Sequence, residues 1–323
     1  MPRLYIQHTY SSEIRVFDEG ADFVQVGTIA LGEAWRPDSV VLSADGSMLY
    51  SNWKDMAYLR ADRRTPSQSL FMAHDAETLE ERWRVPLDGA VEHFAASPDK
   101  RYVWNAVSDR PWLIRVDTQT QAVDYVQITS FGGHKVRVSA DGAHCYVGSI
   151  MTCELTEVNT QTLRRTRVAA FDDYVRPFDL TRDGRLAYIQ LSRMHGIVEF
   201  DLQRWQINRT VAWPRLPPET PVETAFPFTV DHGVEVTPDD TLGLFLATTG
   251  DHLLVCGLPD LQIVRQVPLG VEPSYLTLSP DGQRIYITNR VTCDVQVVAR
   301  DSWSIVGQFE TGGKRPQRIC VSR

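Results

Sequence analysis

Three of the eight histidines in the chain occupy comparable places in its sequence. His93, His134 and His232 each come four or five residues before a Ser or Thr that opens a short polar turn. Neutral imidazoles that converge from several strands bind divalent ions such as Fe, Zn, Mn, Cu or Ni. We therefore predict a divalent transition-metal site, although no local motif such as H-E-x-x-H marks one. The alternative is that each ring hydrogen-bonds within its own loop.

Two other histidines and one aspartate are candidates for proton transfer. His195 precedes the apolar segment IVEF, His8 ends the segment RLYIQH, and Asp231 directly precedes His232. Imidazole and carboxylate groups act as general acids or bases when a fold brings them beside a reacting atom. We predict catalytic roles for His195, His8 and Asp231.

A set of arginines indicates an anionic ligand. Arg36, Arg176 and Arg315 each precede a proline at a similar place in the sequence, and guanidinium groups bind carboxylate or phosphate bidentately. The alternative is ion pairing with acids of neighbouring segments. The predicted substrate-binding residues are Arg36, Arg176, Arg315 and Glu272, with Arg290 and Arg318 expected nearby.

An internal repeat predicts the elements that position these residues. Its turns contain Asp45, Asp99, Asp141, Asp183, Asp239 and Asp281, which are 54, 42, 42, 56 and 42 residues apart. A period of about 42 residues is typical of a propeller blade. The six copies are VVLSADGSMLYSN (40–52), FAASPDKRYVWNA (94–106), VRVSADGAHCYVG (136–148), FDLTRDGRLAYIQ (178–190), VEVTPDDTLGLFL (234–246) and LTLSPDGQRIYIT (276–288).

Each copy predicts four short strands with almost no helical periodicity. The C-terminal RPQRICVSR (315–323) matches a first strand, and the N-terminal RLYIQH (3–8) matches a second strand. Joining them completes a seventh blade and hides the open sheet edges. We therefore predict an all-β, seven-bladed β-propeller of four-stranded blades, forming a single domain over residues 1–323.

The chain resembles the YVTN-type β-propeller repeat family. LSPDGQRIYITN (278–289), LSADGSMLYSN (42–52) and SPDKRYVWN (97–105) carry the resemblance, and VEPSYLTLSPDG (271–282) is its fullest copy. The family fold implies that the loops before each first strand and after each second strand share one face, around a central channel. The candidate histidines and arginines are then expected at the channel mouth. Related propellers include metal-assisted lyases, lactonases, oxygenases and scaffolds, so the resemblance leaves the activity open.

Two enlarged repeats predict long loops on the same face. They contain residues 53–68 and 214–231, and the second leads directly to His232. Long loops in a compact repeat commonly cover a site or bind a protein partner, although ordinary loop variation is the alternative. Apolar walls are expected from Tyr58, Trp213, Phe226 and Phe228.

Composition narrows the classes of function. The net charge is −8 with no cluster of Lys and Arg, which argues against nucleic acid and against an anionic membrane surface. The start of the chain shows no signal-peptide pattern, so we expect a cytoplasmic protein, with a removed leader as the alternative. The five scattered cysteines are expected to be small core residues. Glycine-rich nucleotide motifs are absent, so no nucleotide cofactor is expected.

Together these patterns favour a small-molecule enzyme with a histidine-rich, metal-binding site and an anionic substrate. Lyase, hydrolase and oxidoreductase chemistry all remain open. The alternative is a non-catalytic binding module or accessory subunit that uses the same face for a protein partner.

Overall fold

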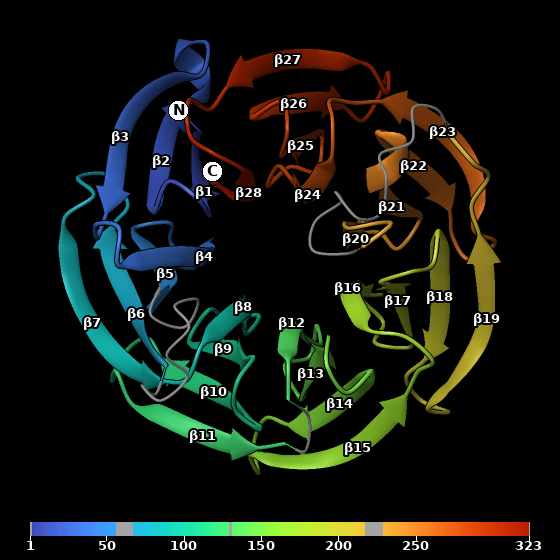
Figure 1. The fold of residues 1–323 in the computed structure, drawn as a ribbon, viewed down its shortest axis with the longest axis horizontal. Coiled ribbons are helices and arrows are strands. Elements are labelled where there is room, and N and C mark those ends of the chain that lie inside the picture. Colours follow the sequence, from blue (N-terminus) through green and yellow to red (C-terminus); the bar gives the residue numbers. More distant parts are fainter. Residues whose placement is uncertain (1, 56–66, 129–130, 217–228, 323) are drawn as a thin grey trace. The chain divides into compact units, whose positions relative to one another are not determined.

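The computed structural model describes residues 2–55, 67–128, 131–216 and 229–322. Its strands form seven four-stranded sheets, so the fold is the all-β, seven-bladed propeller that the repeat predicted (Figure 1). Contacts divide the chain into two compact units, Met1–Ala170 with Cys320–Arg323, and Phe171–Ile319. The single domain over residues 1–323 stays a prediction.

The first unit holds three complete blades and the N-terminal strands of a fourth. Two short 3-10 turns occur in the described chain, η1 (Glu19–Ala21) here and η3 (Thr248–Gly250) in the second unit. The strands of the first unit are β1 (Arg3–His8), β2 (Glu13–Asp18), β3 (Val24–Ala30), β4 (Trp35–Leu42), β5 (Met48–Asp55), β6 (Gln68–Asp75), β7 (Glu81–Asp88), β8 (Val91–Ala96), β9 (Tyr102–Val107), β10 (Trp112–Asp117), β11 (Val123–Gln127), β12 (Gly133–Val138), β13 (His144–Ser149), β14 (Glu154–Asn159) and β15 (Arg164–Ala170).

The second unit holds three complete blades, and the last strand of the chain begins in it. These strands are β16 (Val175–Leu180), β17 (Leu186–Leu191), β18 (Gly196–Asp201), β19 (Gln206–Ala212), β20 (Val234–Val236), β21 (Leu242–Ala247), β22 (His252–Gly257), β23 (Gln262–Pro268), β24 (Pro273–Leu278), β25 (Arg284–Asn289), β26 (Asp294–Ala299), β27 (Ile305–Glu310) and β28 (Pro316–Val321).

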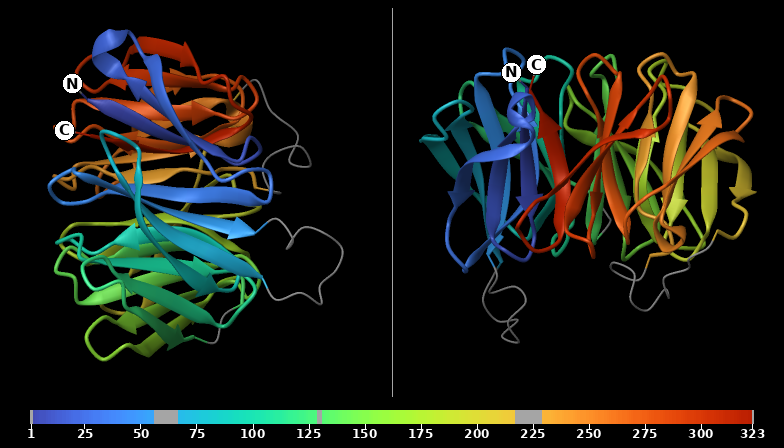
Figure 2. Two further views of the ribbon diagram at one scale, coloured as in Figure 1. Left: turned by 90° about the vertical axis from the view of Figure 1, so that its left-hand side faces the viewer. Right: turned by 90° about the horizontal axis from the view of Figure 1, so that it is seen from above.

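The seventh sheet joins the two ends of the chain. Its strand order is β28-β1-β2-β3, as the matching N- and C-terminal segments predicted. The Ser322 amide donates to the Arg3 carbonyl oxygen at 2.9 Å, and the Arg3 amide donates to Ser322 Oγ at 2.7 Å. Both views of Figure 2 accordingly place the N and C labels side by side. These bonds occupy backbone groups that would otherwise form an open sheet edge.

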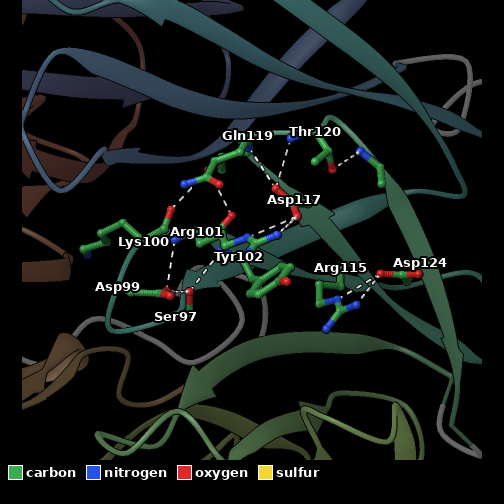
Figure 3. Close-up of polar contacts among 12 residues, drawn as sticks. Ser97, Asp99, Lys100, Arg101, Tyr102, Arg115, Asp117, Gln119, Thr120 and Asp124 are labelled. Atoms are coloured by element: carbon green, nitrogen blue, oxygen red, sulfur yellow. Dashed lines mark hydrogen bonds and ion pairs between the residues drawn. The ribbon is translucent and has the colours of Figure 1, made fainter.

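The repeated Ser/Thr-x-Asp turns fold as expected, as one blade of the first unit shows (Figure 3). Ser97 Oγ donates to Asp99 at 2.5 Å and accepts from the Tyr102 amide at 2.9 Å. The Asp99 carboxylate accepts from the Arg101 amide at 3.1 Å. Lys100 has a φ of 61°, the left-handed conformation in which four sister turns place glycine. The sequence pattern thus reflects local hydrogen bonding and backbone geometry.

Burial within a blade follows the position of each strand. The second strand β17 is buried along its whole length, whereas the fourth strand β15 contains only exposed and half-buried residues. A middle strand packs on both faces, while an outer strand presents one face to water. The candidate polar residues at the starts of the first strands are therefore exceptions within an apolar interior.

A β-bulge in the first strand of a blade explains how those polar side chains are oriented. In β4 the pairing passes from Pro37↔Trp53 to Ser39↔Asn52, so Asp38 is an extra residue opposite β5. The same shift makes His134 the extra residue in β12 and Ser274 the extra residue in β24. It occurs again in β8, between Val91 and Phe94, and in β16, between Val175 and Phe178. A bulge bends its strand and re-aims a side chain.

Candidate functional site

The bulges in β4, β8, β12, β16 and β24 mark one equivalent position, and counting along the sequence extends it to the blades of β20 and β28. This position lies five residues before the turn Ser or Thr, and each occupant is polar and either buried or half-buried. Counting five residues back from the turn hydroxyl would have found both acids of this set, of which the sequence prediction considered Asp38 only as an ion-pairing acid and omitted Glu92. The seven residues are Asp38, Glu92, His134, Arg176, His232, Ser274 and Gln317.

His232 is fully buried in the second unit, just before β20. Its Nδ1 lies 2.8 Å from the Ser274 carbonyl oxygen, and its ring packs edge-on against Tyr275, with 4.9 Å between the ring centroids. A carbonyl oxygen can only accept, so Nδ1 carries the hydrogen in this contact. In the neutral ring, Nε2 is then the basic nitrogen.

The surroundings of His232 keep its ring neutral. Burial lowers its pKa well below the usual value, and the guanidinium groups of Arg176, Arg290 and Arg318 lower it further. The Ser274 carbonyl opposes them only in part. A neutral imidazole therefore lies in the positive field of three arginines, all within the second unit.

Each of these arginines is held by its own contact. Arg176 Nε donates to Ser192 Oγ at 2.7 Å, and Arg290 Nη1 lies 3.5 Å from Glu272 Oε2. The Arg318 guanidinium stacks over the Tyr275 ring, 4.9 Å from its centroid. Arg176 and Arg290 are only 4% and 1% exposed. Guanidinium groups fixed in this way, with little contact with water, suit a carboxylate or phosphate ligand.

The structure places some of the predicted substrate-binding residues in one group. Arg176 and Glu272 belong to the arginine group around His232, where Glu272 pairs with Arg290. Arg315 is half-buried just before β28, and it is Arg318 that acts on the pKa of His232. Arg36 belongs to the first unit, where its guanidinium stacks over Tyr10 at 4.7 Å.

The first unit contains a second charged group, around Lys54. Lys54 Nζ lies 3.0 Å from Asp38 Oδ2 and 2.8 Å from Glu92 Oε1. Burial acts to lower the pKa of Lys54, but the two carboxylates outweigh it and raise the pKa. The pKa of Glu92 is raised by burial and by Asp38, against the effect of Lys54. The predicted alternative of ion pairing thus applies to Asp38, although its partner is a lysine that the sequence prediction missed.

Two of the predicted metal ligands lie beside this group. The rings of His93 and His134 are 4.1 Å apart between centroids, and His93 Nε2 is 3.9 Å from Asp38 Oδ1. Within the described ranges, however, no set of three or more His, Cys, Asp or Glu side chains is arranged to hold a metal ion. The site of His93, His134 and His232 stays a prediction, and we derive no chemical step through a metal.

The predicted acid–base residues have different surroundings. His195 and Asp231 hydrogen-bond to each other in the second unit, with 3.1 Å between His195 Nδ1 and each carboxylate oxygen. His8 is fully buried at the end of β1, and burial, reinforced by Arg15, lowers its pKa to about 3. A contact with the Ile6 backbone opposes this shift only in part. This environment is that of a neutral core residue.

Most residues of the two predicted long loops lie outside the described residues. Tyr58, Phe226 and Phe228 are among them. Trp213 is described and is buried, and its ring packs 5.5 Å from that of Phe245. All five cysteines are free. Cys145 and Cys256 are fully buried, as expected for core residues, whereas Cys153, Cys293 and Cys320 are only half-buried. In the described chain, no helix is long and apolar enough to cross a membrane.

Solved structures share this fold, whereas no protein-family model and no curated protein matches the sequence. The periplasmic gluconolactonase of Pseudomonas aeruginosa superposes with a TM-score of 0.76 at 16% identity, covering 100% of this chain and 99% of its own. A candidate 6-phosphogluconolactonase of Bacteroides uniformis gives 0.75 at 16% identity, with 99% of both chains covered. Hydrazine synthase of Kuenenia stuttgartiensis gives 0.70 at 14% identity, over 91% of this chain and 94% of that one. At these identities the likeness establishes the propeller fold, and the YVTN-type family stays a prediction.

The Lys54 group gives a stability prediction. Lys54→Met should lower the free energy of unfolding by about 3–5 kcal/mol, because two largely buried carboxylates lose their cation. Chemical denaturation would measure the loss. Arg82→Met is the control, because Arg82 pairs with Asp75 on the surface, and its effect should be much smaller. Equal losses of unfolding free energy in the two variants would show that the buried ion pairs of Lys54 stabilise the fold no more than a surface ion pair does.

His8 gives a prediction for pH dependence. Its folded-state pKa of about 3 is below the unfolded value, so the unfolded chain binds the extra proton. The contribution of His8 to stability is therefore complete above about pH 6.5 and is lost as the pH falls from there toward 3. His8→Leu removes this contribution. Denaturation at several pH values should show a flatter profile for His8→Leu than for the wild type, and parallel profiles would contradict the assignment.

Proposed function

We propose that the chain is a hydrolase that opens the cyclic ester of a small anionic substrate, a lactone that carries a carboxylate or phosphate. The observation that carries the proposal is the neutral His232 in the field of Arg176, Arg290 and Arg318. The names of two structural neighbours, a gluconolactonase and a candidate 6-phosphogluconolactonase, support the choice of hydrolysis among the predicted chemistries.

The chemistry follows from the geometry around His232. Water attacks the lactone carbonyl carbon while His232 Nε2 takes one of its protons, as a general base does. A guanidinium group stabilises the oxyanion that forms on the carbonyl oxygen. The bond to the ring oxygen then breaks, and the imidazolium returns its proton to the departing alkoxide. The products are a carboxylic acid and an alcohol, and His232 is neutral again.

The arginines have two roles in this scheme. They bind the anionic group of the substrate, and their field disfavours a charged His232 in the empty site. A bound anion offsets this field, so the imidazole becomes a better proton acceptor when substrate is present. Glu272, paired with Arg290 at 3.5 Å, orients one of these guanidinium groups.

The test is proton release from the phosphate ester of gluconolactone, followed at constant pH, with gluconolactone itself as the neutral comparison. We expect turnover above the spontaneous rate, and His232→Gln should lower kcat about 10²–10⁴-fold. Arg176→Gln and Arg290→Gln should lower kcat/KM about 10²-fold. The control is Arg209→Gln in the same unit, whose guanidinium pairs with Glu199 away from His232.

Two results would contradict the proposal. A wild-type rate equal to spontaneous hydrolysis on the phosphorylated lactone would remove the hydrolase function. If such a protein still bound the phosphorylated acid through the arginines, it would be a non-catalytic anion-binding protein, which is neither the proposed hydrolase nor the predicted module for a protein partner.

A further inference from the structure

Asp231 directly precedes His232 in the chain, so its contacts restrain the backbone that carries His232. Its carboxylate is fully buried, and both of its oxygens lie 3.1 Å from Nδ1 of His195, whose single hydrogen they share. The carboxylate also accepts from the Gly196 amide at the start of β18, at 3.1 Å. Burial raises the pKa of Asp231, and these donors act against that shift. The carboxylate therefore ties the segment before β20 to the blade of β18.

His195 links this carboxylate to a third segment. Its Nε2 lies 3.0 Å from the Pro214 carbonyl oxygen, while its Nδ1 faces Asp231. Both partners are acceptors, so the ring satisfies both when each nitrogen carries a hydrogen. With both of its ring nitrogens engaged, His195 is poorly placed to exchange protons with a substrate. This geometry differs from the catalytic role that the sequence predicted for His195 and Asp231.

Backbone contacts leave little freedom where these segments meet. Thr229 Oγ1 donates to the Asp231 carbonyl oxygen at 2.7 Å, and the Gly233 amide donates to Gln190 Oε1 at 2.8 Å. Glycine is required at position 196, because a Cβ there would collide with the Val211 carbonyl oxygen. His232 is thus fixed through Asp231 on one side and through Ser274 and Tyr275 on the other.

We propose that His195 and Asp231 are positioning residues, which hold His232 so that Nδ1 stays on the Ser274 carbonyl oxygen and Nε2 stays directed at the substrate. The pair sets the backbone from which the imidazole projects and takes no part in the proton transfer itself. This inference rests on the proposed function for its kinetic consequence, but its structural consequence can be observed without any turnover.

The kinetic test compares Asp231→Asn, His195→Ala and the double variant with the wild type. Each should lower kcat about 10–100-fold, the usual range for residues that orient an active-site group. KM and the Kd for inorganic phosphate should stay within about threefold, because the arginines are untouched. The double variant should lose no more than the worse single variant, since the two residues act as one unit.

The matched control is Asp173→Asn. Asp173 is also a buried carboxylate of the second unit, and it accepts from the Arg193 amide and pairs with the Arg193 side chain. It should leave kcat within about twofold of the wild type. A similar fall in kcat for Asp173→Asn and Asp231→Asn, or a parallel loss of phosphate affinity in Asp231→Asn, would overturn the positioning role.

An NMR readout separates this inference from the proposed function. The ¹⁵N spectrum of His232 should show a single neutral ring with hydrogen on Nδ1 in the wild type and in Asp173→Asn. In Asp231→Asn and His195→Ala it should show a mixture of tautomers. An unchanged His232 spectrum in both variants would overturn the inference, whether or not the protein opens lactones. His195→Ala supplies the result if Asp231→Asn does not fold, because His195 is partly exposed.

Discussion

The bulge in the first strand of a blade is the constraint on which the candidate site depends. A regular antiparallel pair would direct alternate residues into the apolar interior between blades. The extra residue interrupts this alternation and turns one side chain away from the interior. Asp38, His134 and Ser274 are such residues, and Arg176 lies in the same kind of bulge. These polar positions are therefore a consequence of the strand register, whereas His232 lies just before β20, whose pairing with β21 is regular.

The bulges also free backbone groups that side chains of neighbouring strands then occupy. Asn52 Nδ2 donates to the Glu92 carbonyl oxygen at 2.7 Å in the first unit, and Thr288 Oγ1 donates to that of Gln317 at 2.7 Å in the second. The contact of His232 Nδ1 with the Ser274 carbonyl oxygen is of the same kind. The kind of hydrogen bond that joins neighbouring blades elsewhere thus selects the tautomer of His232. The same hydrogen bond serves both the fold and the proposed chemistry.

The fold could be predicted from the sequence because its determinants are local. The Ser/Thr-x-Asp turns, the alternation within strands and the matching ends of the chain each reflect hydrogen bonding or burial of a few neighbouring residues. The site was only partly predictable. Counting along the chain identified His232 and Arg176, but whether Arg315 or Arg318 acts on His232 depends on the direction of side chains in β28. The catalytic role of His8 stays a prediction, because its ring is as fully buried as that of His232 but lies apart from the three arginines that act on His232. Lys54 follows no motif, since its role depends on carboxylates from two other strands.

The central claim is that Arg176, Arg290 and Arg318 bind an anion beside the basic nitrogen of His232. The most direct measurement is a crystal structure of the protein soaked with phosphorylated gluconate, the product of the proposed reaction on the phosphate ester. The account predicts that the phosphate or the carboxylate contacts at least two of these guanidinium groups, with the other polar end of the product near His232 Nε2. Product bound elsewhere, with the arginine group in contact only with protein, would contradict it.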